Sequence, residues 1–230
     1  MAIETLFFDV GGVLAHPNWQ RVAETLARHG IAGDSARMTA VEPSVRRGLD
    51  TAAGVGATTD QVRGETYFNR IFAETGVPLG PTLEPARAEL AAYHAANNLW
   101  ECVSEDARVV LERLRGTGRR LAVVSNSNGT VRAKLERLEL AGFFEAIVDS
   151  REEGLEKPDP RIFAVALKRM GARPETTVHV GDLYHVDVAG ARAAGLRAVL
   201  VDPRNLYLDH DCVRVPSLTA LADAVESDTL

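Results

Sequence analysis

Short apolar runs that stop abruptly at polar or glycine residues are the strongest pattern along this chain of 230 residues. Continuous apolar runs of this kind are typical of strands that lie buried in a parallel sheet. The pattern therefore predicts one buried sheet, whose strands occupy residues 5–8, 121–124, 146–148, 177–180 and 198–201.

Helical patterns fill the intervals between the last four of these runs. Val131, Leu135 and Leu138 share one apolar face at helical spacing, and Ile162 and Ala166 lie on another. Strands that alternate with helices indicate βαβ units, in which helices cover both faces of a parallel sheet. We therefore predict an α/β fold with a Rossmann-like parallel sheet at its core.

Residues 15–100 interrupt this alternation, because they contain no convincing strand pattern. They carry three apolar stripes at helical spacing, and the glycines and prolines between the stripes mark loops. We expect a helical domain at 15–100, inserted after the first strand. The core domain would then consist of residues 1–14 and 101–230.

Composition narrows the range of functions. The formal net charge is −6, so the chain lacks the basic footprint that binding to nucleic acid or to an anionic membrane requires. Hydrophobic residues make up 46% of the chain, which is enough to build a core and excludes disorder over most of its length. No signal peptide or transmembrane run is visible, and two cysteines cannot form a disulfide framework, so we expect a cytoplasmic protein.

Chemically active side chains follow the predicted strands. Asp9 and Ser125 come directly after the first two runs, and Lys157 lies in the loop after the third. Asp182 follows the fourth run, with Asp187 five residues further along. Ligands of open α/β sheets bind outside the carboxyl ends of the strands, so we expect these side chains to meet at one edge.

This set of groups suits an anionic substrate and a hard metal ion. The carboxylates can hold a divalent cation such as Mg²⁺. The hydroxyl and the ammonium group can hold the oxygens of the substrate, and Gly11 and Gly12 let backbone N–H groups approach it closely. His179 lies inside the fourth run, and we interpret it as an interior histidine rather than a ligand.

The segments around these residues resemble the motifs of the haloacid dehalogenase-like (HAD) hydrolase superfamily. The resemblance is to the subfamily that carries a helical cap inserted after the first core strand. All four motifs occur in the family's order, and the match covers the core from end to end. The matching segments are residues 7–14, 123–126, 156–163 and 180–187.

The resemblance implies a Mg²⁺-dependent phosphatase that acts on a small phosphorylated metabolite. Asp9 would be the nucleophile and would form an aspartyl-phosphate intermediate. Ser125 would hydrogen-bond a phosphoryl oxygen, and Lys157 would neutralise charge on the nucleophile and the transferred group. Asn126 would help to position the substrate from the start of the following helix.

The resemblance also implies the ligands of the metal. Asp9, Asp182 and the backbone carbonyl of Gly11 would bind Mg²⁺. Asp187 would support the metal shell, either directly or through water and Lys157. No nucleic acid or membrane partner is implied, and the oligomeric state does not follow from the sequence.

Gly11 departs from the family pattern. Family phosphatases usually carry a second Asp at this position, which protonates the leaving group and later activates water. General acid–base catalysis typically contributes about 10²–10⁴-fold to a rate, and a glycine supplies none of it. His16, Tyr184 and His185 are candidates to replace this acid; alternatively, the substrate has a good leaving group, as in an acyl phosphate.

Two other functions remain open at this point. Gly11 is compatible with a catalytically weak binding or regulatory protein that keeps the HAD fold. A metal-independent dehalogenase is the third interpretation. Asp182 and Asp187 oppose it, because dehalogenases of the superfamily lack the acidic metal ligand in their fourth motif.

Overall fold

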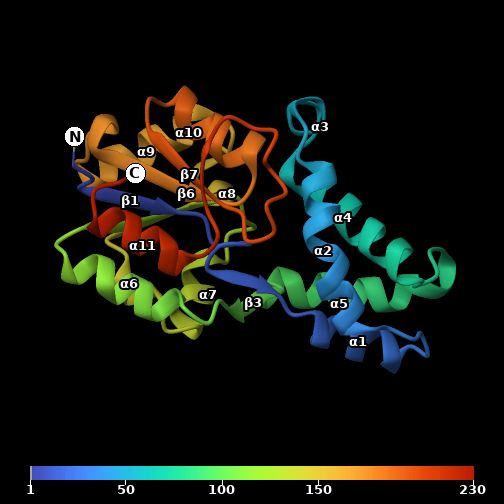
Figure 1. Cartoon of the computed structure of the whole chain (residues 1–230). Coiled ribbons are helices and arrows are strands. Elements are labelled where there is room, and N and C mark those ends of the chain that lie inside the picture. Colours follow the sequence, from blue (N-terminus) through green and yellow to red (C-terminus); the bar gives the residue numbers. More distant parts are fainter. Residues whose placement is uncertain (1) are drawn as a thin grey trace. The chain divides into compact units, whose positions relative to one another are not determined.

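The computed structural model describes residues 2–230, and the chain divides into two compact units. One unit comprises the chain up to His16 together with Glu101–Leu230, and the other is Pro17–Trp100. Figure 1 shows the strands of the first unit and the helices of the second. None of the helices in the described part of the chain has both the length and the apolar character needed to cross a membrane.

The first unit is built on a six-stranded sheet in which every strand pairs in parallel with its neighbours. The strand order is β5-β4-β1-β6-β7-β8, so β1 lies at the centre between β4 and β6. All five predicted strands and the α/β fold class are confirmed. The strands are β1 (Thr5–Phe8), β4 (Arg120–Ser125), β5 (Ala146–Asp149), β6 (Thr177–Gly181), β7 (Arg197–Val201) and β8 (Val213–Val215).

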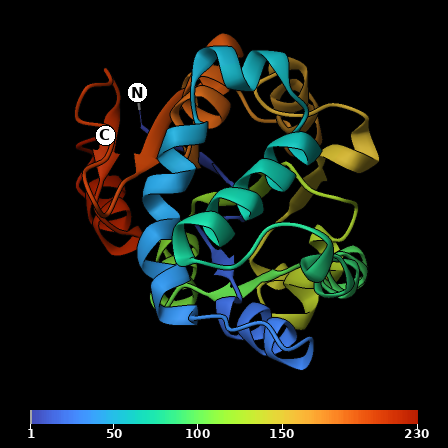
Figure 2. The ribbon, with the colours of Figure 1, turned by 90° about the vertical axis from the view of Figure 1, so that its right-hand side faces the viewer.

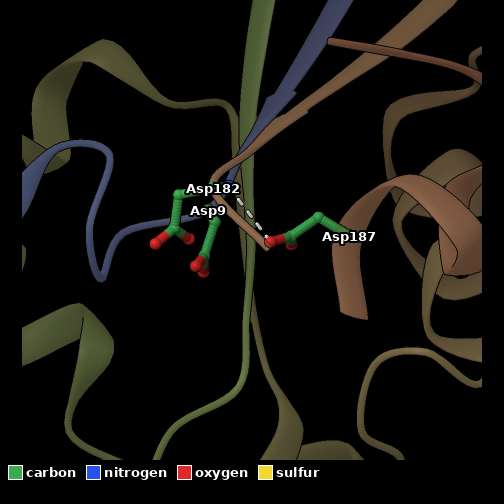
Figure 3. Close-up of side chains that lie close together, drawn as sticks. All are labelled: Asp9, Asp182 and Asp187. Atoms are coloured by element: carbon green, nitrogen blue, oxygen red, sulfur yellow. Dashed lines mark hydrogen bonds between the residues drawn. The ribbon is translucent and has the colours of Figure 1, made fainter. Parts of the chain in front are cut away.

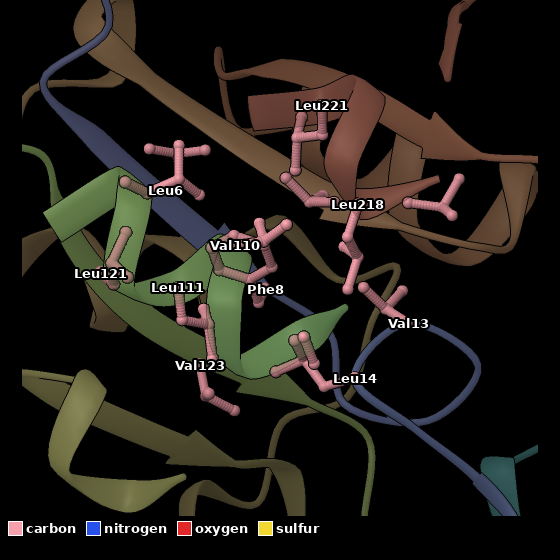
Figure 4. Close-up of a cluster of buried hydrophobic side chains, with 14 of the residues drawn as sticks. Leu6, Phe8, Val13, Leu14, Val110, Leu111, Leu121, Val123, Leu218 and Leu221 are labelled. Carbon is pink, nitrogen blue, oxygen red and sulfur yellow. The ribbon is translucent and has the colours of Figure 1, made fainter. Parts of the chain in front are cut away.

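Alternate residues of the strands enter two separate cores. Leu6 and Phe8 of β1 belong to one hydrophobic cluster, which is drawn in Figure 4, and Phe7 belongs to the other. The first cluster packs under α6 (Ala107–Gly116), α7 (Val131–Arg137) and α11 (Leu218–Glu226). The second packs under α9 (Pro160–Met170) and α10 (Ala189–Ala193).

Helix α9 shows how local sequence sets these elements. Asp159 caps its first turn by accepting a hydrogen bond from Arg161 N, and Pro160 occupies the first helical position, where no N–H is needed. The helix ends at Gly171, whose φ of 56° lies in the left-handed region. The short elements of this unit are α8 (Ser150–Glu153), the 3₁₀ turns η2 (Ala141–Phe143) and η3 (Pro174–Thr176), and the π-helical turn η4 (Tyr184–Val188).

The second unit is helical and has a core of its own. Trp19, Met38, Ile71 and Leu83 are among the buried residues of this core. Helix α1 contacts α2 and α5, and α2 contacts α4 along much of its length (Figures 1 and 2). The elements are α1 (Trp19–Arg28), α2 (Ser35–Leu49), α3 (Ala52–Ala57), α4 (Asp60–Thr75), η1 (Pro81–Leu83) and α5 (Glu84–Asn97).

The chain passes between the units through two short strands. These are β2 (Ala15–Pro17) and β3 (Trp100–Val103), and they form a two-stranded sheet. The sequence does not predict this pair, because neither segment is an apolar run and each is too short to show alternation.

Candidate active site

Asp9 is fixed at the carboxyl end of the central strand. Its backbone N–H donates to Val180 O at 2.9 Å, so the residue stays anchored to the neighbouring strand β6. The chain then turns sharply, and Gly12 adopts a φ of 79°, a conformation that glycine takes without steric cost. The N–H groups of Leu14 and Ala15 both donate to Val10 O and close the turn.

Three carboxylates converge at this edge of the sheet. Each of Asp9, Asp182 and Asp187 places an oxygen within 4.8 Å of the others (Figure 3). Asp9 follows β1, Asp182 follows β6 and Asp187 belongs to the π-helical turn η4. The prediction that these residues meet at one edge of the sheet is therefore matched by the geometry.

Lys157 joins two of these carboxylates. Its side chain is only 1% exposed, and Nζ lies 3.0 Å from Asp9 Oδ1 and 2.6 Å from Asp187 Oδ1. Burial alone would lower the pKa of Lys157, but the Asp187 and Asp9 carboxylates outweigh burial and raise it. The lysine therefore carries its positive charge at any physiological pH.

Asp187 accepts four hydrogen bonds. Its Oδ1 accepts from Lys157 Nζ and lies 2.9 Å from His179 Nε2, and its Oδ2 accepts from the backbone N–H groups of Asp182 and Leu183 at 3.2 and 3.0 Å. Burial would raise the pKa of Asp187, but Lys157 and His179 hold it well below the usual range of a carboxyl group. The carboxylate thus acts as a fixed acceptor that ties Lys157 to the loop after β6.

Two glycines make this close packing possible. A Cβ on Gly181 would lie 2.2 Å from both Cβ and Cγ of Asp187, a distance that real atoms do not adopt. A Cβ on Gly190 would lie 2.9 Å from Pro158 Cα and 3.1 Å from Phe163 Cε2. Glycine is therefore needed at both positions for a steric reason.

Asn126 holds the loop that carries Lys157. Its Oδ1 accepts from Lys157 N at 2.7 Å, and its Nδ2 donates to Lys157 O at 3.0 Å. This double contact gives Asn126 a positioning role that the sequence did not predict, and the predicted contact with substrate stays a prediction, because Nδ2 keeps a second N–H. Ser125 is buried, and its hydroxyl donates a long hydrogen bond of 3.5 Å to Asn126 O, so Oγ is available to an incoming ligand.

The donor set fits a hard cation. Asp9 Oδ1 is buried and lies 3.0 Å from Lys157 Nζ, but it accepts no well-aligned hydrogen bond within residues 2–230, which leaves a lone pair for a metal. Carboxylate and carbonyl oxygens are the ligands that Mg²⁺ takes in proteins. Because Asp187 already accepts four hydrogen bonds, Asp9 and Asp182 are the two carboxylates best suited to direct ligation.

Each side chain considered as a replacement acid for Gly11 has another neighbour. His16 Nε2 lies 3.0 Å from Ser104 Oγ. The Tyr184 and His185 rings contact each other, with ring centroids 5.1 Å apart, and both rings also contact His210.

The sequence analysis did not identify two buried side chains, His179 and Lys134, as members of the site. His179 is interior, as predicted, but it also contacts Asp187. Lys134 is buried on α7, and the charge of Asp9 acts on its pKa, although the sequence analysis did not select it. A signal was present, because Lys134 falls at the same helical spacing as Val131, Leu135 and Leu138 and so interrupts an apolar face.

A parallel α/β core with carboxylates and a lysine at the strand ends is the arrangement that the sequence resemblance implies. The chain belongs to the haloacid dehalogenase-like hydrolases, because the model of that family matches residues 3–195. The predicted family is therefore confirmed, and the chain is an enzyme of the hydrolase class.

Several relatives with curated functions are phosphatases. A glyceraldehyde 3-phosphate phosphatase of Pyrococcus abyssi is 30% identical over 205 residues, which make up 86% of this chain and 80% of that protein. A phosphoserine phosphatase of Thermus thermophilus is 38% identical over 137 residues, or 59% of this chain and 55% of that protein. Among solved structures, the HAD-hydrolase YfnB from Bacillus subtilis has the same fold, with a TM-score of 0.73, 20% sequence identity and coverage of 98% of this chain and 99% of that one.

Proposed function

We propose that this chain is a Mg²⁺-dependent phosphatase that hydrolyses a small phosphorylated metabolite through an aspartyl-phosphate at Asp9. The observation that carries the proposal is the Asp9 carboxylate at the end of β1, 3.0 Å from the buried ammonium group of Lys157 and within 4.8 Å of Asp182. The names of the two curated relatives support phosphate monoesters as the substrate class.

The proposed reaction has two steps at phosphorus. A carboxylate oxygen of Asp9 forms a bond to phosphorus as the bond to the substrate oxygen breaks, and the departing alcohol takes up a proton. Water then attacks phosphorus in the aspartyl-phosphate, loses a proton and releases inorganic phosphate. The Asp9 carboxylate is restored, and the proton that the alcohol gained is balanced by the one that water lost.

Each polar group has a task in this scheme. Lys157 orients Asp9 and offsets the negative charge of the transferring group, and Ser125 Oγ donates to a phosphoryl oxygen. Asp9, Asp182 and the backbone carbonyl of Gly11 would hold Mg²⁺, which supplies positive charge toward the phosphoryl oxygens when it is bound. We assign residues 17–100 the role of a cap that selects the organic part of the substrate.

Gly11 sets the substrate preference within this class. With no carboxyl group at this position, a leaving group that departs without strong protonation is favoured. An acyl phosphate or an aryl phosphate meets this condition better than a simple alkyl phosphate. The same glycine favours the second candidate function, a HAD-like protein that binds a phosphorylated ligand and turns it over weakly or not at all.

The test is phosphate release from an aryl phosphate and from a panel of sugar, nucleotide and acyl phosphates. Each substrate is assayed with Mg²⁺, with chelator and with the Asp9→Asn variant. Asp211→Asn is the matched control, because Asp211 is exposed. We expect turnover that is lost with chelator and with Asp9→Asn and is kept in Asp211→Asn.

The other outcomes separate the alternatives. Binding of a phosphorylated ligand without turnover above background would favour the binding protein. Release of halide from a 2-haloacid in the presence of chelator would favour the dehalogenase and overturn the phosphatase proposal.

A further inference from the structure

The carboxylate of Asp149 ties the chain after β4 to the chain after β5. Asp149 is the last residue of β5, is 1% exposed and lies beside Ser125 in the register of the parallel strands β4 and β5. Its Oδ1 accepts from Arg151 N at 2.9 Å, and its Oδ2 accepts from Val131 N at 3.2 Å. The N–H of Gly129 donates to both oxygens, at 3.2 and 3.1 Å. One buried side chain therefore fixes backbone groups of two loops.

Helix α7 depends on this contact, because its own N-cap residue supplies no side-chain hydrogen bond. That residue is Thr130, whose hydroxyl donates to Asn128 Oδ1 at 2.6 Å. The first N–H groups of a helix have no partner inside the helix, and a carboxylate is a favourable acceptor for them. Asp149 therefore fixes the start of α7 from the neighbouring strand.

Ser150 adds a second connection to the same loop. Its side chain is buried, and Oγ accepts from Ser127 N at 3.0 Å and donates to Ser127 O at 3.1 Å. Asp149 and Ser150 together bind backbone groups of residues 127, 129 and 131. The loop that follows Ser125 is therefore held at several points by the end of β5.

The Ser125 hydroxyl has little else to fix its position. Its one hydrogen bond within residues 2–230 is the long bond of 3.5 Å to Asn126 O. The direction of Oγ therefore depends on the backbone of β4 and of the loop that begins at Asn126. A group that donates to a reacting phosphoryl oxygen needs a fixed position, since a displacement of about 1 Å can cost about 10²-fold in rate.

We propose that Asp149 and Ser150 are positioning residues of the phosphate site, which hold residues 126–131 so that the Ser125 hydroxyl meets a phosphoryl oxygen. The inference rests on the proposed function, and both residues lie outside the four motifs. Because both oxygens of Asp149 already accept backbone N–H groups, its carboxylate acts through the loop rather than on the substrate.

The experiment is a double-mutant cycle between Asp149→Asn and Ser125→Ala. Asparagine has nearly the same shape as aspartate but only one acceptor oxygen, so at least one backbone N–H would face the amide N–H group instead. We expect Asp149→Asn to lower kcat/KM on an aryl phosphate by about 10-fold when Ser125 is present. In the Ser125→Ala background, the same substitution should change kcat/KM by less than about 2-fold, because the group that it displaces is absent.

Ser150→Ala is the second variant. It removes both hydrogen bonds to Ser127 with little change in volume. It should lower kcat/KM by about 3-fold, again only when the Ser125 hydroxyl is present. This variant carries the test if Asp149→Asn does not fold.

The matched control is Asp202→Asn. Asp202 follows β7 directly, is 4% exposed and accepts from Leu206 N at 2.8 Å and from Tyr207 N at 3.0 Å. It makes the same kind of contact as Asp149, in a loop that carries none of the groups assigned to the reaction. Asp202→Asn should lower the midpoint of urea unfolding, as Asp149→Asn does, and leave kcat/KM unchanged.

Three results would overturn the inference. The first is an equal fall in kcat/KM on Asp149→Asn substitution with and without the Ser125 hydroxyl. The second is wild-type kcat/KM in both Asp149→Asn and Ser150→Ala. The third is a comparable fall in Asp202→Asn, which would show that the loss comes from lower stability alone.

The affinity for inorganic phosphate separates this inference from the proposed function. The cycle is repeated by calorimetric titration with inorganic phosphate at a fixed Mg²⁺ concentration, and the Kd should show the same dependence on Ser125. Wild-type protein that binds phosphate but releases none from any ester would overturn the phosphatase, and the cycle in Kd would then decide the role of Asp149 and Ser150. Wild-type protein that neither binds phosphate nor releases it would overturn both.

Discussion

His179→Leu tests whether the contact with Asp187 holds Lys157 in place. The substitution removes the ring N–H that lies 2.9 Å from Asp187 Oδ1. Leucine keeps an apolar side chain in the space beside Phe163, whose ring centroid is 4.9 Å from that of His179. The change is therefore close to the removal of one hydrogen-bond donor from a buried carboxylate.

The expected change in stability is small, because two effects oppose each other. A hydrogen bond to a charged group stabilises a protein by about 1.5–3 kcal/mol. The same ring carries a buried Nδ1 that has no hydrogen-bond partner within the described residues, and an unsatisfied atom of this kind costs about 1–3 kcal/mol. We expect the free energy of unfolding to fall by about 1 kcal/mol, which lowers the Tm of a chain this size by about 2–4 °C.

The expected change in turnover is larger. Without the N–H of His179, Asp187 is less firmly oriented, and the ammonium group of Lys157 loses its fixed position near Asp9. We expect kcat to fall by about 10-fold or more, equivalent to about 1.4 kcal/mol in the activation barrier, with little change in KM. His179→Gln places an amide N–H near the position of Nε2 and should recover most of the rate.

The assays are urea unfolding and initial rates on an aryl phosphate for wild type and both variants. Equal losses of kcat in the leucine and glutamine variants, or full turnover in His179→Leu, would refute the positioning role.

A pH series tests the direction in which the stability contributed by His179 changes with pH. Burial lowers the pKa of His179, so the stability that depends on its neutral form is complete above about pH 6.5 and is lost as the pH falls through the lowered pKa. The stability difference between wild type and His179→Leu should therefore narrow as the pH falls below about 6.5.

Three further predictions concern single positions. Gly181→Ala should lower the free energy of unfolding by about 1–3 kcal/mol and abolish most turnover, because its Cβ would displace Asp187. The control in urea unfolding is Gly116→Ala, whose Cβ would enter open space and should leave the free energy of unfolding nearly unchanged. Gly11→Asp adds a carboxyl group, and the backbone at this position accepts a side chain because its φ lies outside the left-handed region. The variant should raise kcat on an alkyl phosphate by about 10-fold or more, with a smaller gain on an aryl phosphate. Equal gains on the two substrates would argue against an acid role for the new carboxyl group. Because the pKa of Lys134 is about 8 in the folded chain and 10.5 is its ordinary value, the unfolded state binds more protons between these pH values. The stability of wild type, measured by urea unfolding, should therefore rise relative to Lys134→Met from about pH 8 to about pH 10, and parallel pH profiles would contradict this expectation.

The sheet could be predicted from the sequence because its strands are buried on both faces. Residues 5–8 and 177–180 are continuous apolar runs for this reason, and the carboxylates that follow them mark the edge at which the proposed function places the substrate. Strand β8 has only three residues and lies at the edge of the sheet, so its sequence has no comparable pattern.

The supporting contacts of the site could not be predicted, because they depend on three-dimensional packing. Spacing places Asp187 near Asp182, but it does not show that four donors converge on one carboxylate. Similarly, Asn126 follows a strand, as a substrate-binding residue would, yet its amide pairs with the backbone of Lys157. Residue type and position predicted which groups would gather, and packing decided which of them hold one another.

The ends of the helical unit lie beside each other. Asn18 N donates to Leu99 O at 2.8 Å, and the flanking strands β2 and β3 pair directly. The insertion leaves and re-enters the first unit at neighbouring points, so it affects the path of that unit's chain no more than a short loop would. The intervening residues are organised by a core of their own. Such a segment can be exchanged for another of different size without changing the path of the central sheet. Under the proposed function, selection of the organic part of the substrate and phosphoryl chemistry could therefore diverge separately in evolution, each by substitutions in its own part of the chain.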